Sequence, residues 1–416
     1  MCNCANRLLI FFYALALMVI RPVLNKKNAR NNILLILTET GIGDTICFLD
    51  VLRQFPSIVA NTRECKVFLA GDESVGYFLT KAKVIPNDVE FIPLKLQGRN
   101  EFNSFVHNHK VLANKKWNRI VSLQYMGSYV RLLLLGLDYQ QINAVSGGWD
   151  SHSIVNRCLN LLLRDLKILE PSPDVMLFRM YEQVLSSFMD HNVSLSFPYI
   201  PEIPVETSDI SQKPYCVISA GVSGGHANAA RVWPVDRFAK IAEFAINELD
   251  LQVVICGGPS EYEVSAKMIA AMPEEIQSRV YNIVGKTSIE EWIEITRGAE
   301  FVFGNDSGYI HLAAAVRTPS FVVMSYHNYG RFFPYQLNSY QLADWLPIMI
   351  EAERPVCAYC DCPWLFEKDE QAKLRKAKCD SMVACVGLYD CVEEISVDMA
   401  IETVKSWRVN RKRKKG

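Results

Sequence analysis

Three features are missing from this 416-residue sequence, and each absence disfavours one class of protein or site. The net charge is −1, so the chain as a whole has no cationic bias toward nucleic acid. No Asp-x-Asp pair occurs, and a pair of carboxylates is a common way of holding a metal ion on a diphosphate. The apolar run Leu8–Ile20 is shorter than the roughly 18–20 residues that a membrane-spanning helix needs.

Both ends of the chain nevertheless favour a membrane surface. The run Leu8–Ile20 is similar to the apolar region of a signal peptide, but the cationic segment 21–27 follows it in place of a cleavage site. We therefore expect residues 1–30 to form an uncleaved interfacial anchor, with a buried helix or a misassigned start site as alternatives. Residues 408–416 are rich in Lys and Arg, which predicts a basic tail that binds anionic lipid or RNA or is simply solvated.

Eleven of the thirteen cysteines fall into two groups. Those at positions 47, 65, 158, 216 and 256 lie singly in apolar segments, which indicates small buried side chains in a reducing compartment. A later cluster contains Cys357, Cys360, Cys379 and Cys385 as candidate ligands of a structural zinc ion. Their spacing matches no zinc module, so reduced thiols are the alternative.

Apolar strands alternate with helical segments along most of the chain, which predicts doubly wound parallel sheets. The first series has expected strands at 32–37, 66–70, 89–93 and 118–123. Its later part is expected to be helical at 159–169 and 175–190, whereas 129–137 fits a helix or a strand. The second series has expected strands at 215–220, 252–256, 280–283, 301–303 and 320–324.

These patterns divide the chain into a membrane-associating segment, two α/β domains and a C-terminal part. The predicted boundaries are 1–30 for the apolar segment, 31–197 for the first domain, 198–214 for a proline-containing linker, 215–345 for the second domain, 346–407 for the cysteine-rich segment with a final helix, and 408–416 for the basic tail.

Small polar turns follow several of the expected strands. Gly41-Ile42-Gly43-Asp44 follows the first strand, but Ile46 replaces the glycine that a dinucleotide-binding fingerprint needs at that place. Residues 304–308 form a turn of Gly, Asn, Asp and Ser between a strand and a helix. Such a turn either directs backbone N–H groups at an anionic ligand or serves only as a helix cap. Ligands of doubly wound sheets bind at this edge.

Taken in order, these turns resemble glycosyltransferase family 9, the ADP-heptose:lipopolysaccharide heptosyltransferase family. The resemblance extends over residues 32–335. The segments that carry it are Thr40-Gly41-Ile42-Gly43-Asp44, Arg231-Val232-Trp233-Pro234, Gly257-Gly258-Pro259-x-Glu261, Val284-Gly285-Lys286-Thr287-Ser288 and Asn305-Asp306-Ser307-Gly308-x-x-His311-Leu312-Ala313-Ala314-Ala315. It implies an α/β fold of GT-B type, in which two Rossmann-like doubly wound domains face each other across a cleft.

The resemblance implies a role for each polar residue in these segments. Asp44, in the loop with Gly41 and Gly43, would be the general base that deprotonates the acceptor hydroxyl, although helix capping is the alternative and Glu39 is also near. Arg231 stands where the family usually has a lysine that contacts the donor phosphates, and the two are not equivalent.

The remaining implied contacts are with the donor. Glu261 would bind the donor's ribose or only favour its helix as a first-turn carboxylate. Asp306, Ser307 and Gly308 would form the diphosphate turn. His311 would contact the donor or brace this turn from behind.

The predicted function is that of an inverting, metal-independent glycosyltransferase without a cofactor. It would move heptose from ADP-heptose to a lipopolysaccharide core or another lipid-linked glycan, in the cytoplasm at the inner-membrane surface, with no nucleic acid partner. A sugar-nucleotide epimerase of GT-B fold and a non-catalytic sugar-nucleotide or glycan-binding protein are the alternatives.

Overall fold

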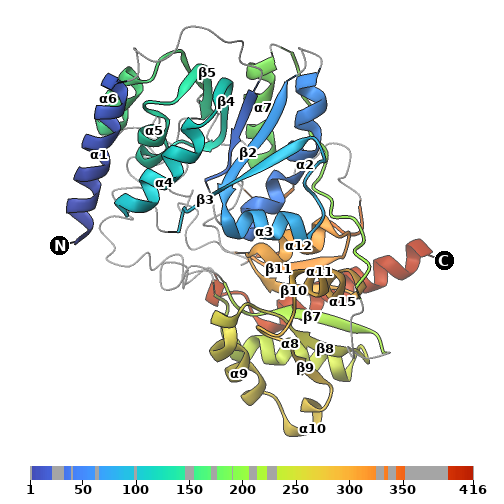
Figure 1. The fold of residues 1–416 in the computed structure, drawn as a ribbon. Coiled ribbons are helices and arrows are strands. Elements are labelled where there is room, and N and C mark those ends of the chain that lie inside the picture. Colours follow the sequence, from blue (N-terminus) through green and yellow to red (C-terminus); the bar gives the residue numbers. More distant parts are fainter. Residues whose placement is uncertain are drawn as a thin grey trace, which may run out of the picture. The chain divides into compact units, whose positions relative to one another are not determined.

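A computed structural model gives the arrangement of the chain (Figure 1). It describes residues 2–20, 32–38, 41–60, 65–97, 101–145, 154–169, 176–189, 191–205, 213–222, 232–324, 332–335, 343–351 and 392–415. The chain forms two compact units. Unit 1 contains Met1–Thr80 and Val84–Ser196, and unit 2 contains Lys81–Lys83 and Phe197–Gly416.

Unit 1 is built on a six-stranded parallel sheet. Its strands are β1 (Asn32–Ile36), β2 (Lys66–Asp72), β3 (Val89–Leu94), β4 (Lys116–Tyr125), β5 (Asp138–Val145) and β6 (Leu166–Leu169). The spatial order is β3-β2-β1-β4-β5-β6, so the direction of strand addition reverses between β1 and β4. This order defines a doubly wound sheet, with its switch point at those two strands.

The helices of unit 1 are α1 (Cys2–Ile20), α2 (Ile42–Ala60), α3 (Glu73–Lys81), α4 (Phe102–Ala113), α5 (Ser128–Leu134), α6 (Ile154–Leu162) and α7 (Leu177–Met189). The prediction of one helix over residues 159–169 is wrong. Helix α6 ends at Leu162, the backbone turns at Asp165 with a φ of 48°, and residues 166–169 form strand β6 beside β5. The undecided segment 129–137 is helical as far as Leu134.

Unit 2 repeats the architecture of unit 1. Its parallel strands are β7 (Tyr215–Ser219), β8 (Gln252–Ile255), β9 (Val280–Asn282), β10 (Val302–Asn305), β11 (Ser320–Val323) and β12 (Ile348–Ile350). Their spatial order is β12-β11-β10-β7-β8-β9, which in chain order is the same winding as in unit 1. The switch point of this sheet therefore lies between β7 and β10.

The helical elements of unit 2 are α8 (Val235–Asn247), the 3₁₀ turn η3 (Pro259–Glu261), α9 (Tyr262–Ala270), α10 (Glu274–Gln277), α11 (Ile289–Gly298), α12 (Gly308–Ala315) and α15 (Val397–Lys415). Helix α15 packs on α8 and β12 through an apolar face that includes Ala400 and Val404. The basic residues from Arg408 onward continue this helix rather than forming a separate extension.

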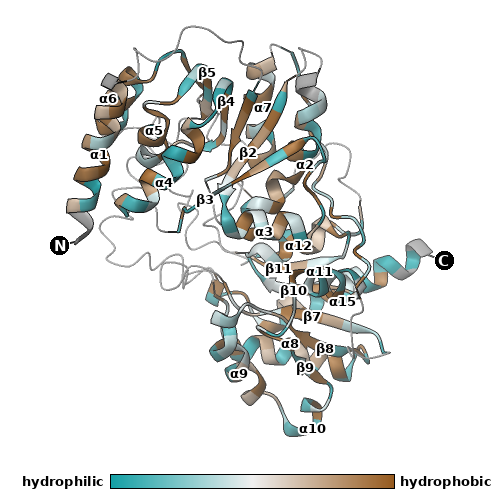
Figure 2. Ribbon diagram, viewed as in Figure 1, coloured by the Kyte–Doolittle hydropathy of each residue, from teal (hydrophilic) through white to brown (hydrophobic). Residues whose placement is uncertain are grey.

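Each unit has its own hydrophobic core, and the strands that form it are largely apolar (Figure 2). In unit 2 the core contains Trp233, which is fully buried and stacks edge-on against Phe238 at 5.1 Å between ring centroids. The indole N–H of Trp233 donates to the carbonyl of Ile395 at 2.8 Å. Trp233 therefore fixes the start of α8 to the segment that precedes α15.

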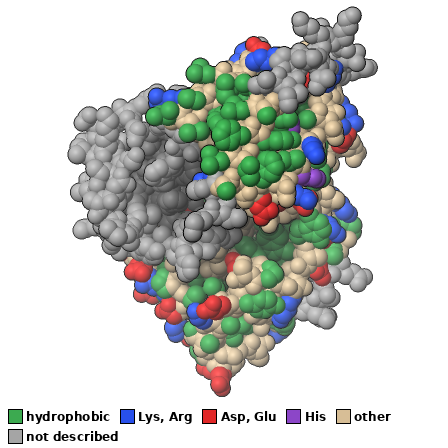
Figure 3. Space-filling view, turned by 60° about the vertical axis from the view of Figure 1, so that its left-hand side comes forward, with side chains coloured by type: hydrophobic (Ala, Val, Ile, Leu, Met, Phe, Trp, Pro, Cys, Tyr) green, Lys and Arg blue, Asp and Glu red, His purple; other side chains and the backbone are tan. Residues whose placement is uncertain are grey.

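Helix α1 packs on the core of unit 1 instead of standing apart from it. Ile10 and Ala14 are buried, and Tyr13 packs edge-on against Phe102 and Phe105 of α4. The opposite side of the helix exposes apolar side chains, which form part of the apolar area visible on unit 1 (Figure 3). No helix in the described residues is both long and apolar enough to cross a bilayer.

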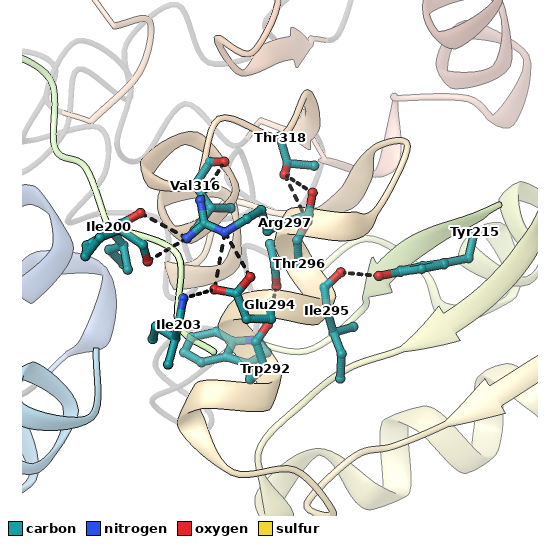
Figure 4. A network of polar contacts seen from close by, with 11 residues as sticks. Ile200, Ile203, Tyr215, Trp292, Glu294, Ile295, Thr296, Arg297, Val316 and Thr318 are labelled. Atoms are coloured by element: carbon teal, nitrogen blue, oxygen red, sulfur yellow. Dashed lines mark hydrogen bonds and ion pairs between the residues drawn. The ribbon is translucent and has the colours of Figure 1, made fainter. Parts of the chain in front are cut away.

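The proline-containing stretch after unit 1 is held by a polar network rather than hanging free (Figure 4). The Arg297 guanidinium donates to the carbonyls of Ile200 and Pro201, both at 2.9 Å. Glu294, which is paired with Arg297, accepts the backbone N–H of Ile203 at 2.9 Å. Residues 200–203 are therefore anchored to α11 and belong structurally to unit 2.

Candidate functional site

Polar turns follow three neighbouring strands of unit 2, at the carboxyl edge of its sheet. Gly221 follows β7, the segment Gly257–Glu261 follows β8, and Asp306 follows β10. Because β10 and β7 flank the switch point and β8 is next to β7, these three turns meet at one place. The expectation that these turns follow strands is confirmed for the described residues.

Asn305 joins these turns from inside the protein. Its side-chain amide donates to the carbonyl of Ala220 at 2.7 Å, and its side-chain oxygen accepts the backbone N–H of Trp233 at 2.9 Å. The side chain is fully buried, so both partners would lack a hydrogen bond without it. Sequence reasoning included Asn305 in a motif but gave it no role.

The turn Asp306-Ser307-Gly308 leads directly into α12. Ser307 occupies the N-cap position in extended conformation, yet its hydroxyl makes no cap hydrogen bond and finds no partner among the described residues. Asp306 is 2% exposed, so its carboxylate lies within the turn rather than in open solvent. The first N–H groups of any helix lack intrahelical acceptors, and at α12 they lie beside the switch point. This arrangement suits an anionic ligand.

Glu261 turns its carboxylate back over the glycines of two strand ends. Gly258 donates its backbone N–H to Glu261 Oε2 at 2.6 Å. A Cβ atom placed on Gly221 would stand only 1.8 Å from Glu261 Oε1, so this carboxylate lies directly against the end of β7. Glu261 is half-buried, and this burial raises the pKa of its carboxyl above the usual 4.5. A half-buried carboxylate at such an edge can accept hydrogen bonds from ligand hydroxyls.

His311 lies on the inner side of α12, among aromatic rings. Its ring stacks on Phe333 at 4.9 Å with an interplanar angle of 11°, and its Nδ1 is hydrogen bonded to the hydroxyl of Tyr335. Burial lowers the pKa of His311 from 6.5 to about 3, so the imidazole is neutral in the folded protein. These contacts hold the imidazole against Phe333 and Tyr335.

Tyr309 follows Gly308 on the same helix and packs edge-on against Trp292, at 4.9 Å between ring centroids. Its pKa is raised well above 10, first by burial and then by the nearby Cys256 and Glu261. The ring therefore lies close to the Glu261 carboxylate and forms part of the wall between α11 and α12. Sequence reasoning did not single out Tyr309, because an aromatic residue in a helix is most often a core residue.

The corresponding switch point of unit 1 carries the loop with Gly41, Gly43 and Asp44. The loop begins at Thr38, whose backbone N–H donates to the side chain of Gln124 at the end of β4, at 2.7 Å. Asp44 is in the first turn of α2, and a Cβ atom on Gly41 would stand 2.8 Å from Asp44 Oδ2. The carboxylate therefore folds back over Gly41, and a side chain at position 41 would have to displace it. Gln124 was missed because its partner lies 86 positions away in the sequence.

Two predicted groups fall outside the described residues. Arg231 and the cysteines Cys357, Cys360, Cys379 and Cys385 all lie in parts of the chain that the structure does not describe. Within the part that it does describe, no cluster of three His, Cys, Asp or Glu side chains is arranged to hold a metal ion. The phosphate contact of Arg231 and the zinc site therefore stay predictions.

The sequence of the middle part of the chain matches a known family. Residues 161–354 match the pattern of glycosyltransferase family 9 (heptosyltransferase). This stretch contains the turns at Gly221, Glu261 and Asp306 and ends just after β12.

Individual relatives are similar over shorter stretches. Lipooligosaccharide heptosyltransferase 2 of Haemophilus influenzae is 31% identical over 114 residues, which are 27% of this chain and 32% of that protein. Lipopolysaccharide heptosyltransferase 2 of Salmonella typhimurium is 32% identical over 96 residues, or 23% of this chain and 27% of that protein. The chain thus spans about a third of the length of the curated relatives that it matches.

Solved structures match along nearly the whole chain, at low sequence identity. ADP-heptose lipopolysaccharide heptosyltransferase II of Escherichia coli has a TM-score of 0.59 at 16% identity, covering 92% of this chain and 99% of that one. A family 9 glycosyltransferase of Veillonella parvula has a TM-score of 0.65 at 15% identity, covering 93% and 100%. These likenesses confirm the predicted GT-B type fold of two doubly wound α/β units.

Proposed function

Because residues 161–354 match the pattern of glycosyltransferase family 9, we propose that the chain is an inverting, metal-independent heptosyltransferase. Its donor is ADP-heptose, and its acceptor is a lipopolysaccharide core or a related lipid-linked glycan at the cytoplasmic surface of the inner membrane. One observation carries the proposal: a shielded carboxylate and the N-terminal amides of α12 meet at the switch point of unit 2.

The two parts of this site have the chemistry that a sugar nucleotide requires. The amides at the start of α12 and its dipole favour the negative charge that develops on a departing diphosphate. Glu261 accepts hydrogen bonds, as the hydroxyls of a ribose would supply. Relatives of matching sequence are named as heptosyltransferases, and one similar solved structure holds ADP-2-deoxy-2-fluoro heptose.

Unit 1 supplies the base in this proposal. Direct displacement at the anomeric carbon inverts its configuration and needs one group that accepts the proton of the attacking hydroxyl. Asp44 lies in the first turn of α2, after the switch-point strand β1, and Gln124 holds Thr38 just after that strand. In this proposal the Asp44 carboxylate removes that proton.

The first experiment identifies the donor by thermal stabilisation of the protein with ADP-, GDP-, UDP- and CDP-linked sugars. A ligand at 100 times its dissociation constant adds about 2.7 kcal/mol of stability, so the preferred nucleotide will stand out. We expect ADP-heptose to raise the melting temperature most. A preference for a UDP- or GDP-linked sugar would refute the assignment of ADP-heptose as the donor.

The second experiment separates binding from chemistry. The Asp44→Asn variant is expected to bind the donor with unchanged affinity and to lose transfer by at least about a hundredfold, the usual contribution of a general base. Glu73→Gln is the matched control, because Glu73 also lies in the first turn of a helix that follows a strand of the same sheet. Normal turnover by Asp44→Asn would refute the base assignment.

Two outcomes for the parent protein would favour the alternative functions. Isomer formation without an acceptor would favour an epimerase, and donor binding without turnover would favour a binding protein.

A further inference from the structure

Helix α6 covers the core of unit 1 with Leu159 but also points three apolar side chains away from it. Ile154, Val155 and Leu161 are 77%, 52% and 86% exposed. Two polar side chains face inward and are satisfied there: Asn156 accepts from the Ser128 hydroxyl at 2.7 Å, and Asn160 accepts from Arg131 at 2.7 Å. The helix therefore turns two amide side chains toward α5 and exposes three aliphatic ones, which marks an interaction surface.

Helix α1 presents a second group of the same kind. Its side chains at Leu8, Leu9 and Phe12 are 57%, 52% and 63% exposed, while Ile10 and Ala14 are buried in the core of unit 1. Both α1 and α6 pack against α5, so their outward sides belong to one region of unit 1. Apolar side chains cover much of this region (Figure 3). We call the six exposed residues of the two helices the apolar face.

The charged side chains of the two helices themselves have one sign. Neither α1 nor α6 contains an acidic residue, and each carries an exposed arginine, Arg7 and Arg157. Residues 1–30 as a whole contain Arg7, Arg21, Lys26, Lys27 and Arg30 but no Asp or Glu. Apolar side chains bordered by cations are the composition of segments that lie in the interface of an anionic bilayer.

We propose that α1 and α6 together form a two-helix docking surface for anionic lipid, in which the apolar face inserts at the level of the headgroups. The inference rests on the proposed function only for its setting, since a lipid-linked acceptor would be found at the same surface. A symmetric dimer through this face is disfavoured, because it would bring Arg7 and Arg157 of one copy close to those of the other.

Flotation of the full-length protein with vesicles tests the proposal. Vesicles of phosphatidylglycerol and phosphatidylethanolamine are compared with vesicles of phosphatidylcholine alone, in the absence of any sugar nucleotide. The parent chain is expected to float with the anionic vesicles and to be released by high salt only in part, because the apolar contribution is not screened.

Variants then locate the contact. Ile154→Ser with Leu161→Ser, and separately Leu8→Ser with Phe12→Ser, are each expected to weaken vesicle binding by at least about tenfold, since each removes two aliphatic or aromatic side chains from the interface. Tyr77→Ser on α3 is the matched control, because Tyr77 is 56% exposed and lies in the same unit. Its binding should equal that of the parent. Unchanged melting temperatures will establish that every variant is folded.

Three results would overturn the proposal. One is vesicle binding that survives both pairs of substitutions. Another is loss of binding only when Lys412, Arg413 and Lys414 of α15 are changed to Ser. The third is a parent chain that is dimeric in solution, ignores vesicles and becomes monomeric on Leu161→Ser. Heptose transfer to a soluble, deacylated acceptor should be unaffected by the α1 and α6 variants, so failure of the docking surface and failure of the proposed activity give different results.

Discussion

The backbone N–H of Trp233 donates a hydrogen bond of 2.9 Å to the side-chain oxygen of Asn305, and both residues are fully buried. The other half of the Asn305 amide donates to Ala220, at the end of β7. A single side chain at the end of β10 therefore fixes both the neighbouring strand and the segment that leads into α8. The geometry of the switch point in unit 2 depends on it.

Replacing Asn305 by Ala is expected to lower the free energy of unfolding by about 2–4 kcal/mol, because two buried backbone groups lose their partners. Donor affinity should fall as well, since the strand ends lose their common anchor. Urea unfolding and donor titration measure the two effects. Asn247→Ala, at an exposed position of α8, should change stability by less than about 0.5 kcal/mol. Equal stabilities for both variants would contradict the anchoring role.

The glycines around Glu261 give a prediction with a matched control in the same site. Gly221→Ala would place a methyl group 1.8 Å from Glu261 Oε1, whereas Gly258→Ala would meet nothing within 4 Å. We expect the first change to displace the carboxylate and to weaken donor binding by about tenfold or more, the value of a hydrogen bond to a charged group. The second change should leave binding near that of the parent.

A double variant tests whether the clash with Glu261 is the cause. Glu261→Ala removes the atoms that the new methyl group would meet, so in that background Gly221→Ala should have little further effect on donor affinity or stability. Isothermal titration of the four proteins completes the cycle. If the effects of the two substitutions on donor affinity were additive, the close approach of Gly221 and Glu261 would not contribute to donor binding.

Much of the fold could be predicted from the sequence because buried parallel strands are nearly continuous apolar runs, as at β1 and β8. Strand β5 was missed because Gln140, Gln141 and Asn143 interrupt its apolar pattern. Strand β6 was taken for helix because its leucines continue the spacing of α6. The break comes from the left-handed backbone at Asp165, and the pairing of Ile142 with Leu166 then defines a strand. Neither this backbone conformation nor this strand pairing can be recognised in the local sequence.

The candidate site shows the same division. Its turns were found because small polar residues after apolar strands have few other uses. The hydrogen bonds that support these turns were not predicted, because each of them joins residues far apart in sequence: Asn305 with Ala220, and Thr38 with Gln124. The role of His311 also could not be read locally, since its environment depends on Phe333 and Tyr335, more than twenty positions later.

His311 gives stability a pH dependence whose direction follows from its lowered pKa. The folded protein keeps the imidazole neutral down to about pH 3, while the unfolded chain binds a proton below about 6.5. The stability that depends on the neutral imidazole is therefore fully present above pH 6.5. It is lost as the pH falls, and the free energy of unfolding is lower by about 2 kcal/mol at pH 5. Urea unfolding at pH 7.5 and pH 5.0 measures this loss.

The His311→Gln variant should be less stable than the parent at pH 7.5, because it loses the ring that stacks on Phe333. Between pH 7.5 and pH 5.0, the free energy of unfolding of the variant should nevertheless fall by about 2 kcal/mol less than that of the parent. His191→Gln, at an exposed position after α7, is the control and should retain the steeper dependence. An unchanged slope in His311→Gln would show that this imidazole does not control the acid sensitivity.

Arg297 is expected to determine whether the stretch after unit 1 stays attached to unit 2. The Arg297 guanidinium donates to the carbonyls of Ile200 and Pro201, and Glu294 beside it accepts from Ile203 (Figure 4). Both side chains are largely shielded, with 16% and 15% of their surface exposed, so the pair is worth more than an ion pair on the surface. Arg297→Ala removes the partner of two carbonyls and leaves the Glu294 carboxylate without its cation. We expect a loss of about 2–4 kcal/mol in unfolding free energy, together with faster amide exchange at Ile203.

The control for Arg297→Ala is Lys267→Ala on α9. Lys267 forms an ion pair with Glu263 at a similar sequence separation, but its side chain is 66% exposed and that of Glu263 is 79% exposed. Solvent screens such a pair, so its loss should lower the free energy of unfolding far less than Arg297→Ala does and should leave exchange at Ile203 unchanged. Arg297→Lys distinguishes charge from geometry, because a lysine keeps the charge but cannot reach two carbonyls and a carboxylate in the same planar arrangement. If Arg297→Lys matched the parent in both measurements, the attachment of residues 200–203 would depend on charge alone and not on the fork of hydrogen bonds.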